Sequence, residues 1–206
     1  MVAYLRAWAA NDVATMQSNS APDSPARAYA DYWGSVYDAG RLDVGQADLR
    51  IREDSAVLTY TDGNAYRLSG FETDQGGVVT WKAVPGGPLA TRIRTGQTTI
   101  RIAGVRVTAG TQYENTESSV RIVLDVHNNA KQRRDLEAPV YVSPDGSRSA
   151  SALGADGRTG VIPVSPGSTQ TGLVAAADAQ IGGRLQVRVF DRAGQVLGAK
   201  TLALPN

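Results

Sequence analysis

The stretch 120-VRIVLDVHNNAKQRRD-135 indicates how the second half of this chain folds. Valine, isoleucine and leucine occupy every second position from Val120 to Val126, which is the period of a strand with one buried face. His127, the single histidine of the chain, falls on the opposite face beside Asp125, just before the turn residues Asn128 and Asn129. The pattern predicts a strand that ends at this histidine.

The same alternation continues through residues 97–206, where about seven short runs are separated by turn residues such as Pro144-Asp145-Gly146 and Ala193-Gly194. No helical period occurs there, and this spacing of strands and turns predicts a β-sandwich. Within TTIRIAGVRVTA, the first run, Gly104 is expected to form a bulge.

The first half has a different period. Residues 2–17 place apolar side chains at helical spacing, and a second helix with an aromatic stripe is predicted over 25–39, begun by Ser24-Pro25. After residue 44 the period changes to two, which predicts a meander of about four strands ending with LATRIR at 89–94. We therefore expect an α+β domain over 1–96 and an all-β domain over 97–206.

Composition excludes several classes of function. The 206 residues carry a net charge of +1, with no concentrated basic face for nucleic acid or an anionic membrane. Cysteine is absent, so disulfides, thiolate metal sites and cysteine nucleophiles are excluded. No apolar run reaches the length of a membrane span, and no signal peptide is recognisable.

The chain begins abruptly. MVAYLRAWAANDVATM is helical in pattern from its second or third residue, with no capping residue before it. We expect that an export signal or membrane anchor precedes this segment in the natural protein, and that contact with a membrane is made only through that anchor.

The first half resembles the cystatin-like cone of the nuclear transport factor 2-like superfamily. The resemblance rests on AYLRAWAANDVATM at 3–16, RAYADYWGSVYDAG at 27–40 and the meander that follows. It is similar to non-catalytic domains of Gram-positive penicillin-binding proteins and of conjugation proteins. This resemblance implies a two-helix cone with no catalytic group.

The second half resembles the immunoglobulin-like domain of secreted actinobacterial lipoproteins. The residues that carry it are SSVRIVLDVHNNA at 118–130 and PVSPGSTQTGLVAAA at 163–177. Both resemblances imply an extracytoplasmic, secreted or membrane-anchored protein of the cell envelope.

Aromatic residues of the first half suggest a ligand pocket as one alternative. Tyr29, Tyr32, Trp33 and Trp81 could form the wall of a cone that binds a small apolar ligand. The other interpretation, which we favour, is that these rings pack the second helix onto the sheet.

Candidate catalytic groups are few. His127 has no second histidine for a metal site, and no nucleophile elbow accompanies it, so we interpret it as a surface residue. Asp12, Asp31 and Asp38 are the carboxylates available for acid–base chemistry, but we favour their interpretation as helix charges or caps. The sequence thus predicts no enzyme, no cofactor and no metal.

Basic residues mark two possible interaction surfaces. Arg92, Arg94 and Arg101 flank the short connection between the halves and are expected to project to the polar side. The loop 131–134, Lys-Gln-Arg-Arg, could touch an anionic polymer or lipid, or serve only as a solubilised loop. Because the connection is short, we expect the two domains to pack together.

These observations predict a non-enzymatic envelope protein that acts as an interaction or scaffolding module. The expected partner is another envelope protein or a second copy of the chain. The alternative is a small-ligand binding protein that uses the cone of the first half.

Overall fold

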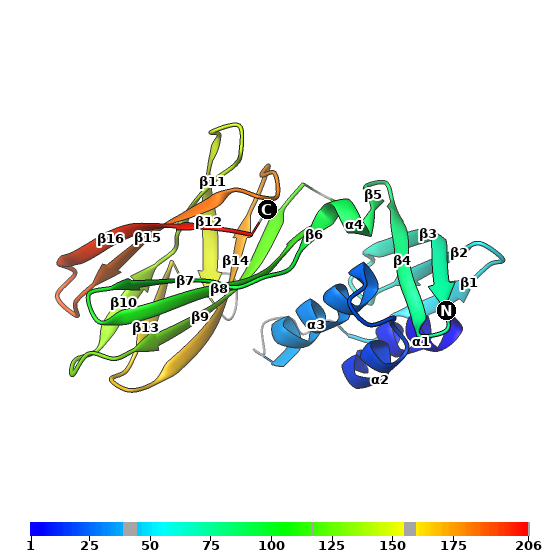
Figure 1. Cartoon of the computed structure of the whole chain (residues 1–206), viewed down its shortest axis with the longest axis horizontal. Coiled ribbons are helices and arrows are strands. Elements are labelled where there is room, and N and C mark those ends of the chain that lie inside the picture. Colours follow the sequence, from blue (N-terminus) through cyan, green and yellow to red (C-terminus); the bar gives the residue numbers. More distant parts are fainter. Residues whose placement is uncertain (39–44, 117, 155–159, 206) are drawn as a thin grey trace. The chain divides into compact units, whose positions relative to one another are not determined.

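The computed structural model describes residues 1–38, 45–116, 118–154 and 160–205. It is mostly β, with 50% of residues in strands and 16% in helices. The described residues form four short helices, one five-stranded sheet and one eleven-stranded sheet (Figure 1). Two compact units meet in the sequence between Ile93 and Arg94, the two residues of the short strand β6, which pairs within the sheet of the second unit. The predicted fold class, a two-helix cone followed by a separate immunoglobulin-like sandwich, is therefore wrong.

The helices of the first unit differ from the two that were predicted. Among the described residues they are α1 Val2–Ala9, α2 Val13–Ser18, α3 Pro25–Asp38 and the one-turn α4 Leu89–Arg92. The prediction of a helix over 25–39 is confirmed by α3, and the Ser24 hydroxyl accepts from the backbone N–H of Arg27 at 3.1 Å, as an N-cap does.

The predicted single helix over 2–17 is broken after Ala9. Asn11 takes a left-handed backbone conformation, with φ of 57°. Asp12 then caps α2, its Oδ1 accepting from the backbone N–H of Thr15 at 3.0 Å. The break does not interrupt the apolar periodicity of the sequence, because α1 and α2 each bury one face in the core of the first unit.

Five strands of the first unit pair with their neighbours in the sequence, all antiparallel. They are β1 Asp48–Ile51, β2 Ser55–Thr59, β3 Ala65–Asp74, β4 Gly77–Val84 and β5 Gly87–Pro88. Helices α1 to α3, drawn in blue, lie along one face of this sheet (Figure 1). The Trp8 ring of α1 lies 5.2 Å from the Trp81 ring of β4, so aromatic side chains join the helices to the sheet.

The second unit has no described helix. Its strands are β6 Ile93–Arg94, β7 Thr98–Ile102, β8 Val105–Glu114, β9 Val120–Asn128, β10 Arg134–Glu137, β11 Val140–Val142, β12 Arg148–Gly154, β13 Val161–Val164, β14 Thr169–Ala176, β15 Arg184–Phe190 and β16 Val196–Ala203. The strand predicted from SVRIVLDV is confirmed by β9. LATRIR, predicted as one strand, is instead α4 followed by β6, and β6 pairs with β8.

One strand explains why this unit is not the predicted sandwich of two separate sheets. The first part of β12 pairs with β11, and Ser151–Gly154 pair with β14. Through β12 the hydrogen bonding is continuous along the order β13-β10-β15-β11-β12-β14-β9-β8-β6, with β16 beside β15 and β7 beside β8. Alternation reveals which face of a strand is buried, but it does not reveal which strands pair.

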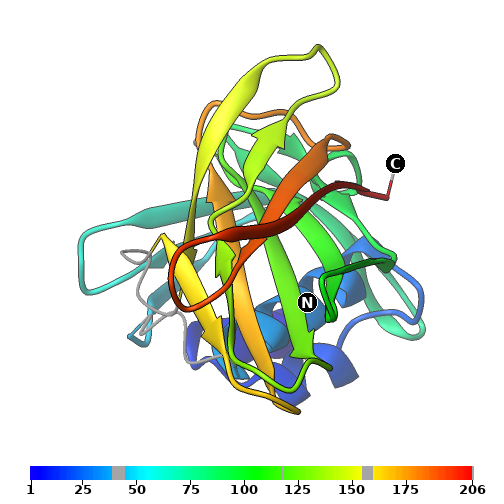
Figure 2. The ribbon, with the colours of Figure 1, turned by 90° about the vertical axis from the view of Figure 1, so that its left-hand side faces the viewer.

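The core of the second unit lies between the two halves of this continuous sheet. From the β8–β9 half come Val107, Ile122 and Leu124, and from the β10–β15 half come Leu136 and Val187, all at most 1% exposed. Figure 2 views this unit from the end at which the β15–β16 hairpin, drawn orange to red, faces the reader.

Gly104 forms a tight turn and not the predicted bulge. Ile102 pairs with Val105, so Ala103 and Gly104 are the two loop residues of the β7–β8 hairpin. Their φ angles are 49° and 83°, the positive values that a type I′ turn requires. The observed register irregularity lies further on, between Ala109 and Gln112 of β8.

None of the helices in the described ranges is sufficiently long and apolar to cross a membrane.

Candidate functional site

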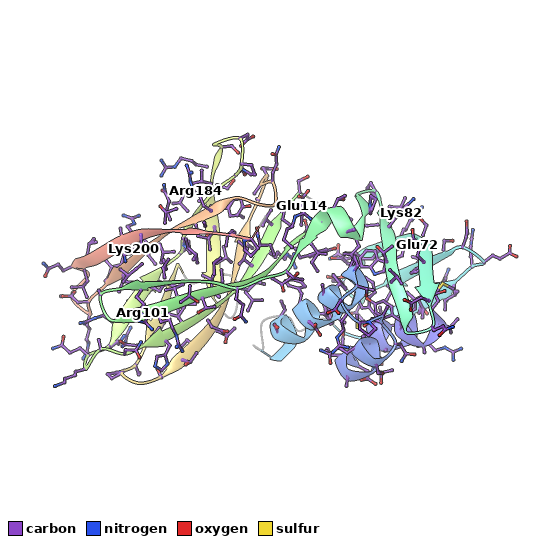
Figure 3. The ribbon with its side chains drawn as sticks, viewed as in Figure 1. Glu72, Lys82, Arg101, Glu114, Arg184 and Lys200 are labelled. Carbon is purple, nitrogen blue, oxygen red and sulfur yellow. The ribbon has the colours of Figure 1, made fainter. Side chains whose placement is uncertain are left out.

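The outward-facing side of β7, β8, β9 and β14 carries two rows of polar side chains, which we name the polar face. Backbone register aligns them from strand to strand. The first row is Arg101, Arg106, His127 and Thr169, and the second row is Thr99, Thr108, Asp125 and Thr171. Every one of these residues is exposed or half-buried, whereas Val107 and Val126, which lie between the two rows on β8 and β9, are fully buried. Figure 3 labels Arg101 on β7.

Hydrogen bonds cross the strands within these rows. His127 Nδ1 lies 2.8 Å from the Thr169 hydroxyl. Asp125 Oδ1 accepts from the Thr171 hydroxyl at 2.7 Å. The hydroxyls of Thr99 and Thr108 lie 3.0 Å apart. These bonds hold the side chains in place in the unbound protein. The loss of side-chain conformational entropy on binding is therefore smaller.

A shallow groove of about 430 Å³ runs over this face. Gln97, Thr99, Arg106 and His127 are among its lining residues. The lining offers hydroxyl, amide, carboxylate, imidazole and guanidinium groups but no phenylalanine, tyrosine or tryptophan ring. Such a lining suits hydrogen bonding to a polar surface and not the enclosure of an apolar small molecule.

Arg101 and Arg106 are direct cross-strand partners. Like charges in that position destabilise a sheet. Neither guanidinium has an ion-pair partner among the described residues, whose salt bridges involve Arg27, Arg50 and two other arginines. Because proteins break such local rules mostly at functional sites, the pair is a candidate contact for a binding partner.

The described residues of the polar face are not arranged as a hydrolytic catalytic triad. His127 and Asp125 each pair with a different threonine, so the carboxylate does not orient the imidazole as in a catalytic triad. No serine lines the groove among the residues described. The described ranges also contain no cluster of three histidine, cysteine or acidic residues that could hold a metal ion.

The four aromatic residues proposed as a ligand wall are buried. Tyr29 and Tyr32 are 2% exposed, Trp81 is 1% exposed and Trp33 is 8% exposed. Tyr29 lies 5.2 Å from Trp81, 6.2 Å from Trp33 and 4.8 Å from Trp8 between ring centroids. Contacts this close are those of aromatic core packing, so the geometry favours the packing interpretation.

The three arginines expected on one interaction surface lie in different environments. Arg92 is 4% exposed at the end of α4, so it does not project to the polar side as expected. Arg94 is half-buried in β6, and Arg101 is exposed in β7. Of the three, Arg101 belongs to the polar face.

The candidate acid–base residues have structural partners. Asp12 is the α2 cap, and hydrogen bonds from Thr15 hold the pKa of its carboxyl below the usual value, so it is ionised at neutral pH. Asp31 pairs with Arg27 at 3.1 Å and accepts from Gln17 at 2.8 Å on the exposed side of α3. The side chain of Asp38 lies outside the described residues.

Sequence reasoning missed most of the polar face. Arg106 and the four threonines are each unremarkable in their own strands, and only the register of β7, β8, β9 and β14 brings them into rows. The one available signal was alternation: their positions oppose the buried residues of each strand.

No family model matches this chain, and no curated protein matches it. Among solved structures, it has a likeness to the crystal structure of the Aeromonas sobria serine protease and the chaperone complex, with 14% identity over 87% of this chain and a TM-score of 0.12. The match spans 39% of that chain's length. At this TM-score the likeness carries no argument about fold or function.

Proposed function

We propose that this protein is a non-enzymatic interaction module of the cell envelope, located outside the membrane, and that it binds another envelope protein through the polar face. The observation that carries the proposal is the adjacent pair Arg101 and Arg106, which has no acidic partner in the described part of the chain. A partner that places a carboxylate between these guanidinium groups would relieve their repulsion and form charge-assisted hydrogen bonds.

The form of the polar face supports a protein partner. A flat array of arginine, threonine and histidine side chains on a rigid sheet resembles the polar component of protein interfaces, in which arginine is enriched. The groove is open and is lined by no phenylalanine, tyrosine, tryptophan or aliphatic side chain, which disfavours a small apolar ligand at this place. The small-ligand alternative in the first unit is weaker, because its proposed wall residues pack against one another.

Location in the envelope rests on the sequence. The resemblances of both halves to extracytoplasmic domains support it. That the two units pack against each other stays a prediction, and so does the membrane anchor.

The test places a photo-crosslinking amino acid at Thr108 in the full chain, expressed in its native cells. We expect one discrete protein adduct in the envelope fraction. Arg106→Glu, which removes the site for a carboxylate, should abolish this adduct. Arg67→Glu is the matched control, because Arg67 is also an exposed strand arginine but lies in β3 of the first unit.

An adduct that survives Arg106→Glu would contradict the proposed surface, and recovery of the protein from the cytoplasmic fraction would contradict the location. An adduct of twice the chain's mass, together with concentration-dependent sedimentation, would identify the partner as a second copy.

A further inference from the structure

Three turns at one end of the second unit enclose a second depression, separate from the polar face. They are the connection between β9 and β10, the turn between β13 and β14, and the turn between β15 and β16. The depression has a volume of about 440 Å³, and we name it the tip pocket. Lys131, Arg133, Arg134, Pro166, Asp191 and Arg192 are the lining residues that matter for its chemistry.

Positive charge in the tip pocket exceeds what its acidic residues neutralise. Arg133 is committed to Asp135, with Nε 2.8 Å from Oδ1. Asp191 is the acid in the lining, and its Oδ1 accepts from the backbone N–H groups of Ala193 and Gln195, both at 2.9 Å. Lys131, Arg134 and Arg192 have no ion-pair partner within the described residues.

Arg134 has an unused donor. Its Nη1 donates to the carbonyl oxygen of Arg133 at 3.3 Å. Its Nε is shielded from solvent and has no hydrogen-bond partner among the described residues. A shielded guanidinium N–H without an acceptor is uncommon, because buried donors are nearly always paired.

The loop that carries these cations is held in place by Asn128, which is fully buried. Its Nδ2 donates to the carbonyl oxygens of Gln132 and Val164, and its Oδ1 accepts from the N–H of Ala130. Its backbone N–H and carbonyl bond to Ser168 and Gly167 in the β13–β14 turn. Two of the three turns are therefore fixed to one residue, so the backbone that carries Lys131 and Arg134 is held in place before a ligand binds. Arg192 lies on the third turn, between β15 and β16.

We propose that the tip pocket binds a phosphate group, presented either as free inorganic phosphate or in the headgroup of an anionic phospholipid. Arg134, Arg192 and Lys131 would supply the N–H donors. A guanidinium group can donate two parallel hydrogen bonds to two oxygens of one phosphate. An ammonium group adds a positive point charge. The volume of the tip pocket suits one phosphate-bearing group. Binding of a long polyanion requires many basic contacts, and the whole chain has a net charge of only +1.

This proposal is independent of the proposed function, because it uses a different set of residues at a different place in the second unit. The test titrates the full chain with inorganic phosphate, followed by calorimetry and by NMR shifts of the 131–134 amides. We expect saturable binding that becomes about tenfold weaker, or more, in Arg134→Gln with Arg192→Gln. Arg184→Gln is the control in the same unit, because Arg184 is an exposed arginine of β15 that lines neither the tip pocket nor the groove of the polar face, and it should leave phosphate binding unchanged.

A second arm distinguishes the two sources of phosphate. Vesicles of phosphatidylglycerol are compared with vesicles of phosphatidylcholine in flotation, with and without competing inorganic phosphate. Flotation with phosphatidylglycerol that free phosphate reverses assigns the headgroup, and phosphate binding without flotation assigns the free anion. The Lys131→Gln variant provides a second measure if the double variant unfolds. The proposal is overturned if no saturable phosphate or vesicle binding occurs, or if Arg184→Gln weakens binding as much as the tip variants.

Discussion

The side-chain Nδ2 of Asn128, at the end of β9, donates to the carbonyl oxygen of Val164, at the end of β13, over 2.9 Å. The same amide group also binds Gln132, and no part of Asn128 is exposed to solvent. One amide thus connects strands from the two halves of the eleven-stranded sheet. All three side-chain hydrogen bonds are made within the protein, so the loss of this group removes a partner from three backbone groups, among them the carbonyl oxygen of the buried Val164.

We expect Asn128→Ala to lower the free energy of unfolding by about 1–3 kcal/mol, the usual cost of unsatisfied buried groups. Chemical denaturation measures it. Asn129→Ala is the matched control, because this neighbour is exposed and should change stability by no more than about 0.5 kcal/mol. If both substitutions lower the free energy of unfolding equally, the side-chain amide of Asn128 does not stabilise the contact between β9 and β13.

The two residues of the β7–β8 turn should respond to substitution with opposite signs. Ala103→Gly is expected to stabilise the protein by about 0.5–1 kcal/mol, because alanine is strained at its φ of 49° and glycine is not. Gly104→Ala should destabilise by about 1–2 kcal/mol, since φ is 83° and a new Cβ would lie 3.0 Å from that of Ala130. Thermal unfolding of both variants measures the difference, and changes of the same sign would contradict a type I′ turn.

Tyr141 should make the protein sensitive to alkali. Its buried hydroxyl donates to the carbonyl oxygen of Gln180 at 2.6 Å and accepts from the N–H of Gly183 at 2.9 Å. Burial raises the pKa of this phenol above its ordinary 10.0, with Glu114 adding to the shift and the Gly183 N–H opposing it. The folded state therefore holds the proton more tightly than the unfolded state.

The stability that Tyr141 contributes is consequently complete below pH 10.0 and is lost as the pH rises toward the folded-state pKa. Tyr141→Phe should cost about 1–3 kcal/mol at neutral pH and show a smaller loss of stability in alkali. Denaturation at a series of pH values tests this, with tyrosinate absorbance following ionisation. Parallel alkaline profiles for both proteins would contradict it.

Trp8 should dominate the stability of the first unit. It is 1% exposed and contacts Tyr4, Tyr29 and Trp81. We expect Trp8→Ala to cost about 3–5 kcal/mol and Trp8→Phe clearly less, because phenylalanine keeps part of the ring contact. Val2→Ala in the same helix is the control, since Val2 is 40% exposed. A loss from Trp8→Ala no larger than from Val2→Ala would mean that the aromatic cluster does not stabilise the unit.

Arg106→Glu should stabilise the second unit even though it is expected to abolish binding. The new carboxylate would face Arg101 across β7 and β8, replacing repulsion by an ion pair. A gain of about 0.2–1 kcal/mol is expected at low salt, and it should shrink in concentrated salt. Denaturation at two ionic strengths measures it, and a destabilised variant would argue against repulsion between the two arginines.

Local patterns in the sequence were sufficient for single elements. Alternation from Val120 to Val126 predicted β9, and Ser24-Pro25 with its aromatic stripe predicted α3. Turn residues at 144–146 and at 193–194 also lie between strands, as predicted. In each case the element depends on residues that are close together in the sequence, because helix capping, turn geometry and strand alternation are local properties.

Tertiary structure alone decided how these elements combine. The passage of β12 from one half of the sheet to the other and the rows of the polar face could not be read from the sequence. Each depends on pairing or packing between residues far apart in the chain: Arg106 meets His127, and His127 meets Thr169. A period of two specifies which side chains are buried, but many strand orders bury them equally well. The order adopted is selected by the packing of the whole core, and that selection places the polar residues beside one another.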